Sequence, residues 1–254
     1  MDGMKNIKEV RDIMGMPITV EVVGARAARS VLDEVFAYFA YVDEIFSTYK
    51  TESEISRINR GELSLETACA DVQSVYEAAN QTCKETDGYF NHRTPDGTID
   101  PSGIVKGWSI QKAAALLKER GVENFCIDAG GDIQTNGVNT DGTQWSVGIR
   151  HPFQTDHIAK VVYPHGKGVA TSGTYLRGEH IYDPTTGAPV VTPFISMTLI
   201  GPNIYDADRF ATAAFAMGKR GMHFIEMLSG YEGYAITHDM QAQVTSGFNE
   251  YTKS

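Results

Sequence analysis

Hydrophobic and polar positions along this chain follow two different periods, which predicts a mixture of helices and strands. Residues 28–49 repeat apolar side chains every three or four positions, the spacing of one face of an α-helix. Residues 67–88 and 104–121 have helical spacing too, and each of these segments ends in a glycine, a residue common just after a helix. Residues 16–24 are instead β-branched and alternating, which predicts a strand.

The second half of the chain consists mainly of short apolar runs separated by turn residues. The strand candidates are FCIDAGG, WSVGIR, AKVVYP, GVATSG, EHIYD and ISMTLIGP. A helix of small residues is expected at 207–218, followed by one short helix and two strands. The pattern indicates an α+β fold with a mainly antiparallel or mixed sheet flanked by helices, and we expect one two-lobed domain over residues 1–254.

Composition and charge exclude several classes of protein. The chain has 254 residues with a formal net charge of -10, so it lacks the excess of Lys and Arg that nucleic-acid binding requires. No run approaches the roughly 20 apolar residues of a membrane span. The three cysteines have neither zinc-site nor disulfide-framework spacing, which favours a reducing compartment. No signal peptide is recognisable, and we expect a cytoplasmic protein.

The stretch FCIDAGGDIQTNG at 125–137 is the first candidate for a ligand site. Its apolar run ends in two glycines and an aspartate, and glycine allows a backbone to approach a ligand closely. The stretch lacks the G-x-G-x-x-G pattern, however, and no long helix follows it, so a Rossmann phosphate site is not indicated. A tight turn between strands is the favoured interpretation.

Two pairs of polar residues suit a phosphate ligand and a metal. Asp100 and Lys106 flank a glycine-bearing loop that opens a helix, where amides and an ammonium attract anions. Asp208 and Thr212 are four residues apart, so a helix places both oxygens on one side, as a Mg²⁺ site requires. A plain helix start with a solvent-facing lysine, and a buried Thr212 below a first-turn Asp208, are the structural alternatives.

A third region combines small hydroxyl residues with a histidine. The run Thr171, Ser172, Gly173 allows close approach of a ligand, and His180 could accept a proton near pH 7. A lone histidine is more often structural or exposed, so His180 by itself is weak support for catalysis.

Together and in this order, these stretches resemble the ApbE family of FAD:protein FMN transferases. The matching stretches are MGM (14–16), FSTYKTESEISRINRGE (46–62), DPSGIVKGW (100–108), DAGGDI (128–133), WSVGIRHP (145–152), VATSG (169–173), HIYDPTTGAP (180–189) and ADRFATAAFAMG (207–218). The chain looks most like a short subgroup with a compressed middle loop.

The resemblance implies an Mg²⁺-dependent transfer of FMN from FAD to a Thr or Ser hydroxyl of an acceptor protein, with release of AMP. Two alternatives remain open, namely an FAD pyrophosphatase that forms FMN and AMP, and a non-catalytic FAD-binding protein. The family's acceptors carry the pattern D-G-x-[ST]-G-[AS]-T, which this chain lacks, so another protein is expected to be the acceptor.

The resemblance also assigns roles to individual residues. The expected metal ligands are the Gly103 carbonyl, Asp208 and Thr212; the expected FAD contacts are Met14, Tyr49, Tyr89, Phe90, Asn91, Asp100, Lys106, Thr171, Ser172 and Gly173. Catalytic roles fall to His180 as the base, with Asp208 and Lys106. The chain departs from the family's usual GAFD at Gly88, Tyr89, Phe90 and Asn91, and has Gly103 where alanine is usual. The GGD stretch is expected to be a close-packed turn beside the nucleotide pocket.

Overall fold

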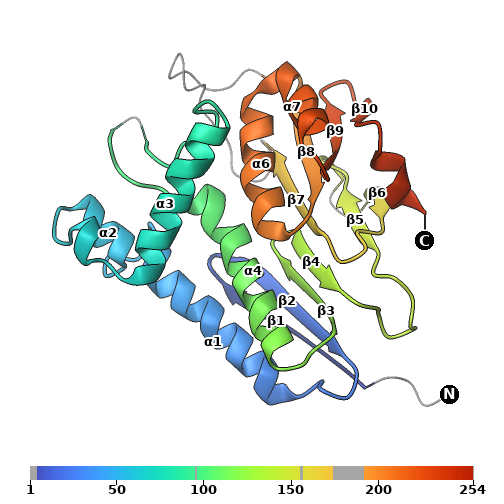
Figure 1. The fold of residues 1–254 in the computed structure, drawn as a ribbon, viewed down its shortest axis with the longest axis horizontal. Coiled ribbons are helices and arrows are strands. Elements are labelled where there is room, and N and C mark those ends of the chain that lie inside the picture. The colour runs from blue at the N-terminus through green and yellow to red at the C-terminus, as the bar shows by residue number, and fades with distance from the viewer. Residues whose placement is uncertain (1–4, 95, 155–156, 174–191, 254) are drawn as a thin grey trace.

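The computed structural model describes residues 5–94, 96–154, 157–173 and 192–253. Within these ranges the chain forms one large antiparallel sheet, a small second sheet and a set of helices, which confirms the α+β prediction (Figure 1). None of the described helices is both long and apolar enough to cross a membrane.

The large sheet has the strand order β1-β2-β3-β4-β7-β8-β9-β10. Its strands are β1 (Asn6–Ile13), β2 (Met16–Val23), β3 (Asn124–Ala129), β4 (Asp132–Asn136), β7 (Gly168–Gly173), β8 (Phe194–Gly201), β9 (Glu232–Thr237) and β10 (Ala242–Val244). The second sheet pairs β5 (Val147–Arg150) with β6 (Ile158–Val162). The strand predicted at 16–24 is confirmed as β2, whereas β1 was not predicted. The EHIYD run lies outside the described residues.

The helices agree with the predicted segments, with shifted ends. They are α1 (Arg29–Phe46), α2 (Glu54–Asn59), α3 (Ala70–Glu85), α4 (Ser102–Glu119), α6 (Ile204–Ala216) and α7 (Gly221–Met227), with 3-10 turns η1 (Leu65–Thr67), η2 (Gly218–Arg220) and η3 (Phe248–Thr252). The helix predicted over 28–49 ends at Phe46 because Ser47 adopts an extended backbone. The short helix α2, capped by the Ser53 hydroxyl, was not predicted.

Two clusters of buried side chains give the molecule its two lobes. The main core joins one face of the sheet to α1, α4 and α6, which run across that face in Figure 1. A second cluster lies in the helical lobe around α2 and α3, and includes Phe46, Val75, Phe90 and Trp108. Both α4 and α6 contribute side chains to both clusters, so the two helices lie at the junction of the lobes.

The opposite face of the sheet packs against the small β5–β6 sheet. On β7, Val169 packs with Val147 and Val162 of the small sheet, whereas its neighbour Ala170 belongs to the helix-covered core. This follows from the alternation of side chains along a strand. The helix-covered face and the β5–β6 face can therefore present different chemical groups.

The turns between β1 and β2 and between β3 and β4 both require left-handed backbone. Met14 and Gly15 have φ values of 57° and 71°, and Gly130 and Gly131 have 62° and 99°. Glycine takes this conformation without strain, and consecutive left-handed residues form the two-residue hairpin turn. The GGD stretch is therefore a tight turn between strands, as predicted.

Candidate functional site

A buried lysine between two carboxylates lies where α4, α6 and β4 meet. The Lys106 Nζ is 2.6 Å from Asp132 Oδ2 and 3.7 Å from Asp208 Oδ1. The three side chains are only 13%, 2% and 5% exposed. Buried charges persist only when they are paired and hydrogen-bonded. Two carboxylates against one ammonium leave an excess negative charge, which favours binding of a cation.

Asp208 is fixed by the backbone of α4. The Gly107 N–H donates to Asp208 Oδ2 at 2.8 Å. A Cβ on Gly107 would lie 2.6 Å from the Asp208 Cβ, so only glycine permits this approach of α4 to α6. In a regular helix the Gly107 N–H would bond to the Gly103 carbonyl. A carbonyl has two lone pairs, so the Gly103 carbonyl can accept within α4 and still offer one lone pair to a metal.

Thr212 and Gly103 lie beside Asp208 at the same junction. The Thr212 hydroxyl donates to the Asp208 carbonyl at 3.2 Å and is 3.5 Å from the Ser172 hydroxyl on β7. A Cβ on Gly103 would be 3.6 Å from Thr212 Cγ2. A carboxylate, a hydroxyl and a main-chain carbonyl are the hard oxygen donors that Mg²⁺ prefers, so these residues fit the ion. Among the described residues, no group of three or more His, Cys, Asp or Glu could hold a metal.

Asp132 is a member of this cluster that the sequence did not single out. It is 1% exposed, follows the two glycines of the GGD turn, and begins β4. Besides its ion pair with Lys106, its Oδ1 accepts from the Thr171 N–H at 3.1 Å. Thr171 therefore meets the cluster through its backbone, while its hydroxyl pairs with the buried Thr198 hydroxyl at 2.8 Å. Its signals in the sequence were its place directly after the two glycines and within the family-matching stretch DAGGDI, both of which drew attention to the glycines.

The expected flavin-site residues are only partly brought together. Phe90 is buried, and its Cε2 is 3.2 Å from where a Cβ on Gly103 would be. Met14 packs against the buried clusters of both lobes. The Tyr89 hydroxyl accepts a hydrogen bond from Arg220, whose guanidinium lies over the Tyr89 ring. Tyr49 is 97% exposed, so its ring faces solvent rather than the lysine cluster.

The remaining expected residues have local roles or lie outside the described ranges. Asn91 is exposed and accepts from the Arg93 N–H at 2.9 Å. Asp100 accepts from the Ser102 N–H at 3.0 Å, which favours a part in starting α4. Gly173 ends β7 opposite Ser196. His180 lies outside the described residues, so its catalytic role stays a prediction.

A cavity of about 380 Å³ is lined by the GGD turn, β3, β4 and the β5–β6 sheet. Its lining includes Asp128, Asp132 and Thr171. Burial raises the pKa of Asp128, and the hydrogen bond from the Gly131 N–H opposes that rise. Because Asp128 and Asp132 lie on one hairpin and only Asp132 pairs with Lys106, Asp128 offers a matched control for Asp132.

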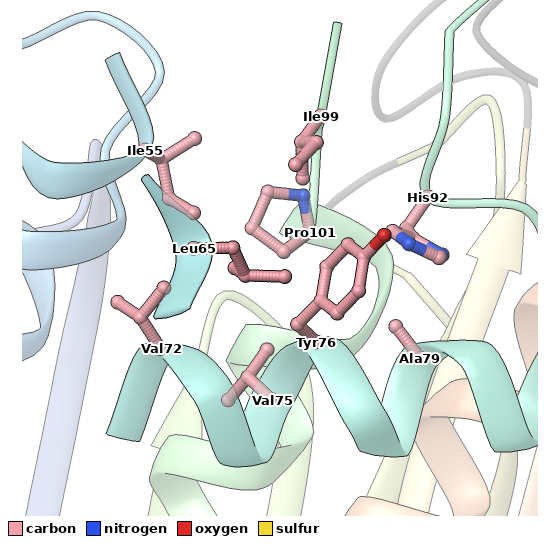
Figure 2. A pocket seen from close by; sticks show the side chains of 9 residues that line it. All are labelled: Ile55, Leu65, Val72, Val75, Tyr76, Ala79, His92, Ile99 and Pro101. Atoms are coloured by element: carbon pink, nitrogen blue, oxygen red, sulfur yellow. The ribbon is translucent and has the colours of Figure 1, made fainter. Parts of the chain in front are cut away.

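A small apolar pocket in the helical lobe is lined by residues that include Tyr76, His92 and Ile99 (Figure 2). His92 is 3% exposed, and its ring meets the Tyr76 ring edge-on at 5.1 Å. Neither ring nitrogen has a hydrogen-bond partner among the described residues. The His92 carbonyl accepts from the Asp100 N–H at 2.8 Å, which ties both ends of the loop together.

Burial, with a smaller contribution from Arg93, lowers the pKa of His92 from its ordinary value of 6.5. The folded chain thus binds fewer protons than the unfolded chain, and this contribution to stability is lost as pH falls below about 6.5. Between pH 7 and pH 5, we expect the free energy of unfolding to fall less in the His92→Phe variant than in the wild type. Urea unfolding at both pH values measures this, with exposed His238→Gln as the control. An unchanged pH dependence in His92→Phe would contradict the prediction.

We expect Gly107→Ala to destabilise the junction of α4 and α6. The added Cβ would meet Asp208 Cβ at 2.6 Å and the Ile204 carbonyl at 2.9 Å, so the helices must separate. Overpacking of this kind costs about 1–3 kcal/mol. Urea unfolding should show this loss, whereas exposed Ser102→Ala in the same helix should remain near the wild type. Equal stability of Gly107→Ala and the wild type would refute the close approach.

A family model described as "ApbE family" matches residues 14–94 and 91–235. The FAD:protein FMN transferase of Vibrio cholerae is 33% identical over 170 residues, which are 63% of this chain and 49% of the relative. That of Treponema pallidum is 30% identical over 167 residues, which are 59% of this chain and 46% of the relative. The chain thus spans about half the length of the curated relatives it matches.

Solved structures show the same fold. The flavin transferase ApbE from Vibrio cholerae superposes with a TM-score of 0.85 at 24% identity, covering 98% of this chain and 99% of that one. The ApbE protein from Thermotoga maritima has a TM-score of 0.84 at 20% identity, covering 98% and 100%. The topology of the sheet and its helices is therefore shared over nearly the whole length of these chains.

Proposed function

Because the chain belongs to the ApbE family, we propose that it transfers FMN from FAD to a Thr or Ser hydroxyl of an acceptor protein and releases AMP. The observation that carries this proposal is the junction of α4 and α6, where Lys106, Asp208, Thr212 and Gly103 meet. The names of the curated relatives, FAD:protein FMN transferase, support the same activity.

The residues of the junction suit phosphoryl transfer, which depends mainly on positioning and on stabilising negative charge. Lys106 would place its ammonium against the oxygens of the pyrophosphate. Asp208, Thr212 and the Gly103 carbonyl would hold Mg²⁺, which when bound offsets the charge on the departing AMP. The burial of Asp208 and Asp132 keeps water from screening these charges.

The bond changes balance without any further reactant. The acceptor hydroxyl oxygen attacks the FMN-side phosphorus, the bond from that phosphorus to the AMP oxygen breaks, and AMP leaves. The hydroxyl proton passes to a base, for which His180 is our candidate from the sequence resemblance. Tyr49, Tyr89 and Met14 remain candidates for contacts to the flavin ring.

The three cysteines support action in a reducing compartment, and we place the protein in the cytoplasm. Cys69, Cys83 and Cys126 are all free thiols. Burial, with nearby carboxylates, raises the pKa of Cys126 to about 12, so this thiol stays protonated and unreactive.

The experiment that tests the function is incubation of the protein with FAD and Mg²⁺, with and without an acceptor domain carrying D-G-x-[ST]-G-[AS]-T. Chromatography follows FAD, FMN and AMP. The proposal predicts AMP release that requires the acceptor, with little free FMN. Equal AMP and FMN without the acceptor would identify an FAD pyrophosphatase, and intact FAD throughout would identify a binding protein.

A further inference from the structure

Asp132 connects three elements of the site through one buried carboxylate. Its Oδ2 lies 2.6 Å from the Lys106 ammonium on α4. Its Oδ1 accepts from the Thr171 N–H on β7 at 3.1 Å. The residue itself begins β4 and is 1% exposed. Movement of this carboxylate would therefore disturb both the lysine and the strand that carries Ser172 toward Thr212.

The GGD turn fixes the position of Asp132 at the start of β4. Gly130 and Gly131 both have positive φ values, and Ala129 pairs directly with Asp132 across the hairpin. A Cβ on Gly130 would lie 3.0 Å from the Met16 sulfur, so this turn is held closely against β2. A two-residue turn of this kind sets the strand register and hence the direction of the next side chain.

The two carboxylates compete for one ammonium. Lys106 Nζ is more than 1 Å closer to Asp132 than to Asp208. Because the attraction between charges increases as they approach, Asp132 holds the ammonium more strongly at this distance. The ammonium is thereby kept from full contact with Asp208, which also accepts from the Gly107 N–H.

We propose that Asp132 is a positioning residue of the site, which acts through Lys106. It holds the Lys106 ammonium toward the sheet, where the substrate's phosphate oxygens would meet it, and limits its competition with a divalent cation at Asp208. The inference rests on the proposed function for the roles of Lys106 and Asp208. The GGD turn then serves to position Asp132 beside Lys106, and its glycines do not bind phosphate.

Asp132→Asn separates this role from a purely structural one. The asparagine side chain keeps its shape and can still accept from the Thr171 N–H, but it cannot pair with the Lys106 ammonium. We expect FAD affinity in the presence of EDTA, measured by flavin fluorescence, to fall about tenfold, as expected when a charge-assisted contact to phosphate is weakened. The Mg²⁺ concentration for half-maximal binding, measured by calorimetry, should increase. Asp128→Asn removes the same charge from the same hairpin and should alter neither value by more than about twofold.

A double-mutant cycle with Lys106→Met tests whether Asp132 acts through the lysine. If it does, adding Asp132→Asn to Lys106→Met should change FAD affinity by less than about twofold, compared with about tenfold in the wild-type background. A tenfold loss in both backgrounds, or no loss in Asp132→Asn alone, would overturn the proposal. Wild-type protein that binds FAD but releases no AMP would refute the proposed function while leaving the coupling between the two residues established.

Discussion

Asp208→Asn is expected to reduce AMP release from FAD by about 10²–10³-fold, the loss typical of removing one group that stabilises developing charge. Asparagine retains an oxygen that can accept from the Gly107 N–H, so the contact between α4 and α6 should persist. The variant loses the negative charge that would hold a divalent cation beside Thr212 and Gly103, and that also lies 3.7 Å from the Lys106 ammonium. The measurement is the initial rate of AMP formation over a range of Mg²⁺ concentrations.

Asp206→Asn is the matched control for this experiment. It removes the same charge from the same helix, where Asp206 pairs with Arg209 rather than with Lys106. Its rate should stay within about threefold of the wild type, as expected for a partly exposed ion pair. Wild-type rates in Asp208→Asn at every Mg²⁺ concentration would exclude Asp208 as a metal ligand.

Lys106→Met is expected to impair both turnover and stability. Loss of the ammonium removes a charge-assisted contact to phosphate, so we expect kcat/KM to decrease by about 10²–10³-fold. It also leaves Asp132 and Asp208 buried without their shared cation. Removal of one partner of a buried ion pair lowers the free energy of unfolding by about 3–5 kcal/mol. Rates must therefore be normalised to the folded fraction, measured by circular dichroism.

Lys118→Met separates a general loss of positive charge from loss at the site. Lys118 lies on the same helix but is exposed near its last turn. This variant should match the wild type in rate and in unfolding midpoint. A Lys106→Met protein that is stable and fully active would show that the buried ammonium plays no part in the reaction.

The success and failure of the sequence predictions have physical causes. Helix α1 was predicted because its buried positions are uniformly apolar. Strand β1 was missed because its inward-facing positions include Glu9 and Arg11, which form an ion pair at 2.8 Å. The Arg11 guanidinium also lies over the Phe36 ring. A charged residue therefore occupies an inward-facing strand position at which alternation predicts an apolar side chain.

The sequence proposed residues for the candidate site, but it could not give the contacts between them. Family resemblance pointed to Asp208, Thr212 and Gly103, and the fold brings these residues together. The bond from the Gly107 N–H to Asp208 joins positions 101 residues apart, a pairing that no local pattern encodes. Asp132 was overlooked because the GGD stretch was interpreted through its glycines, whereas the contact to Lys106 depends on the aspartate.

Transfer of FMN to another protein is tested most directly by the mass of the acceptor after incubation with the protein, FAD and Mg²⁺. We expect an acceptor domain carrying D-G-x-T-G-A-T to gain the mass of one phosphoester-linked FMN, and the same domain with alanine at both threonines of the motif to gain nothing. An acceptor whose mass stays unchanged while AMP and free FMN accumulate would contradict transfer and establish hydrolysis instead.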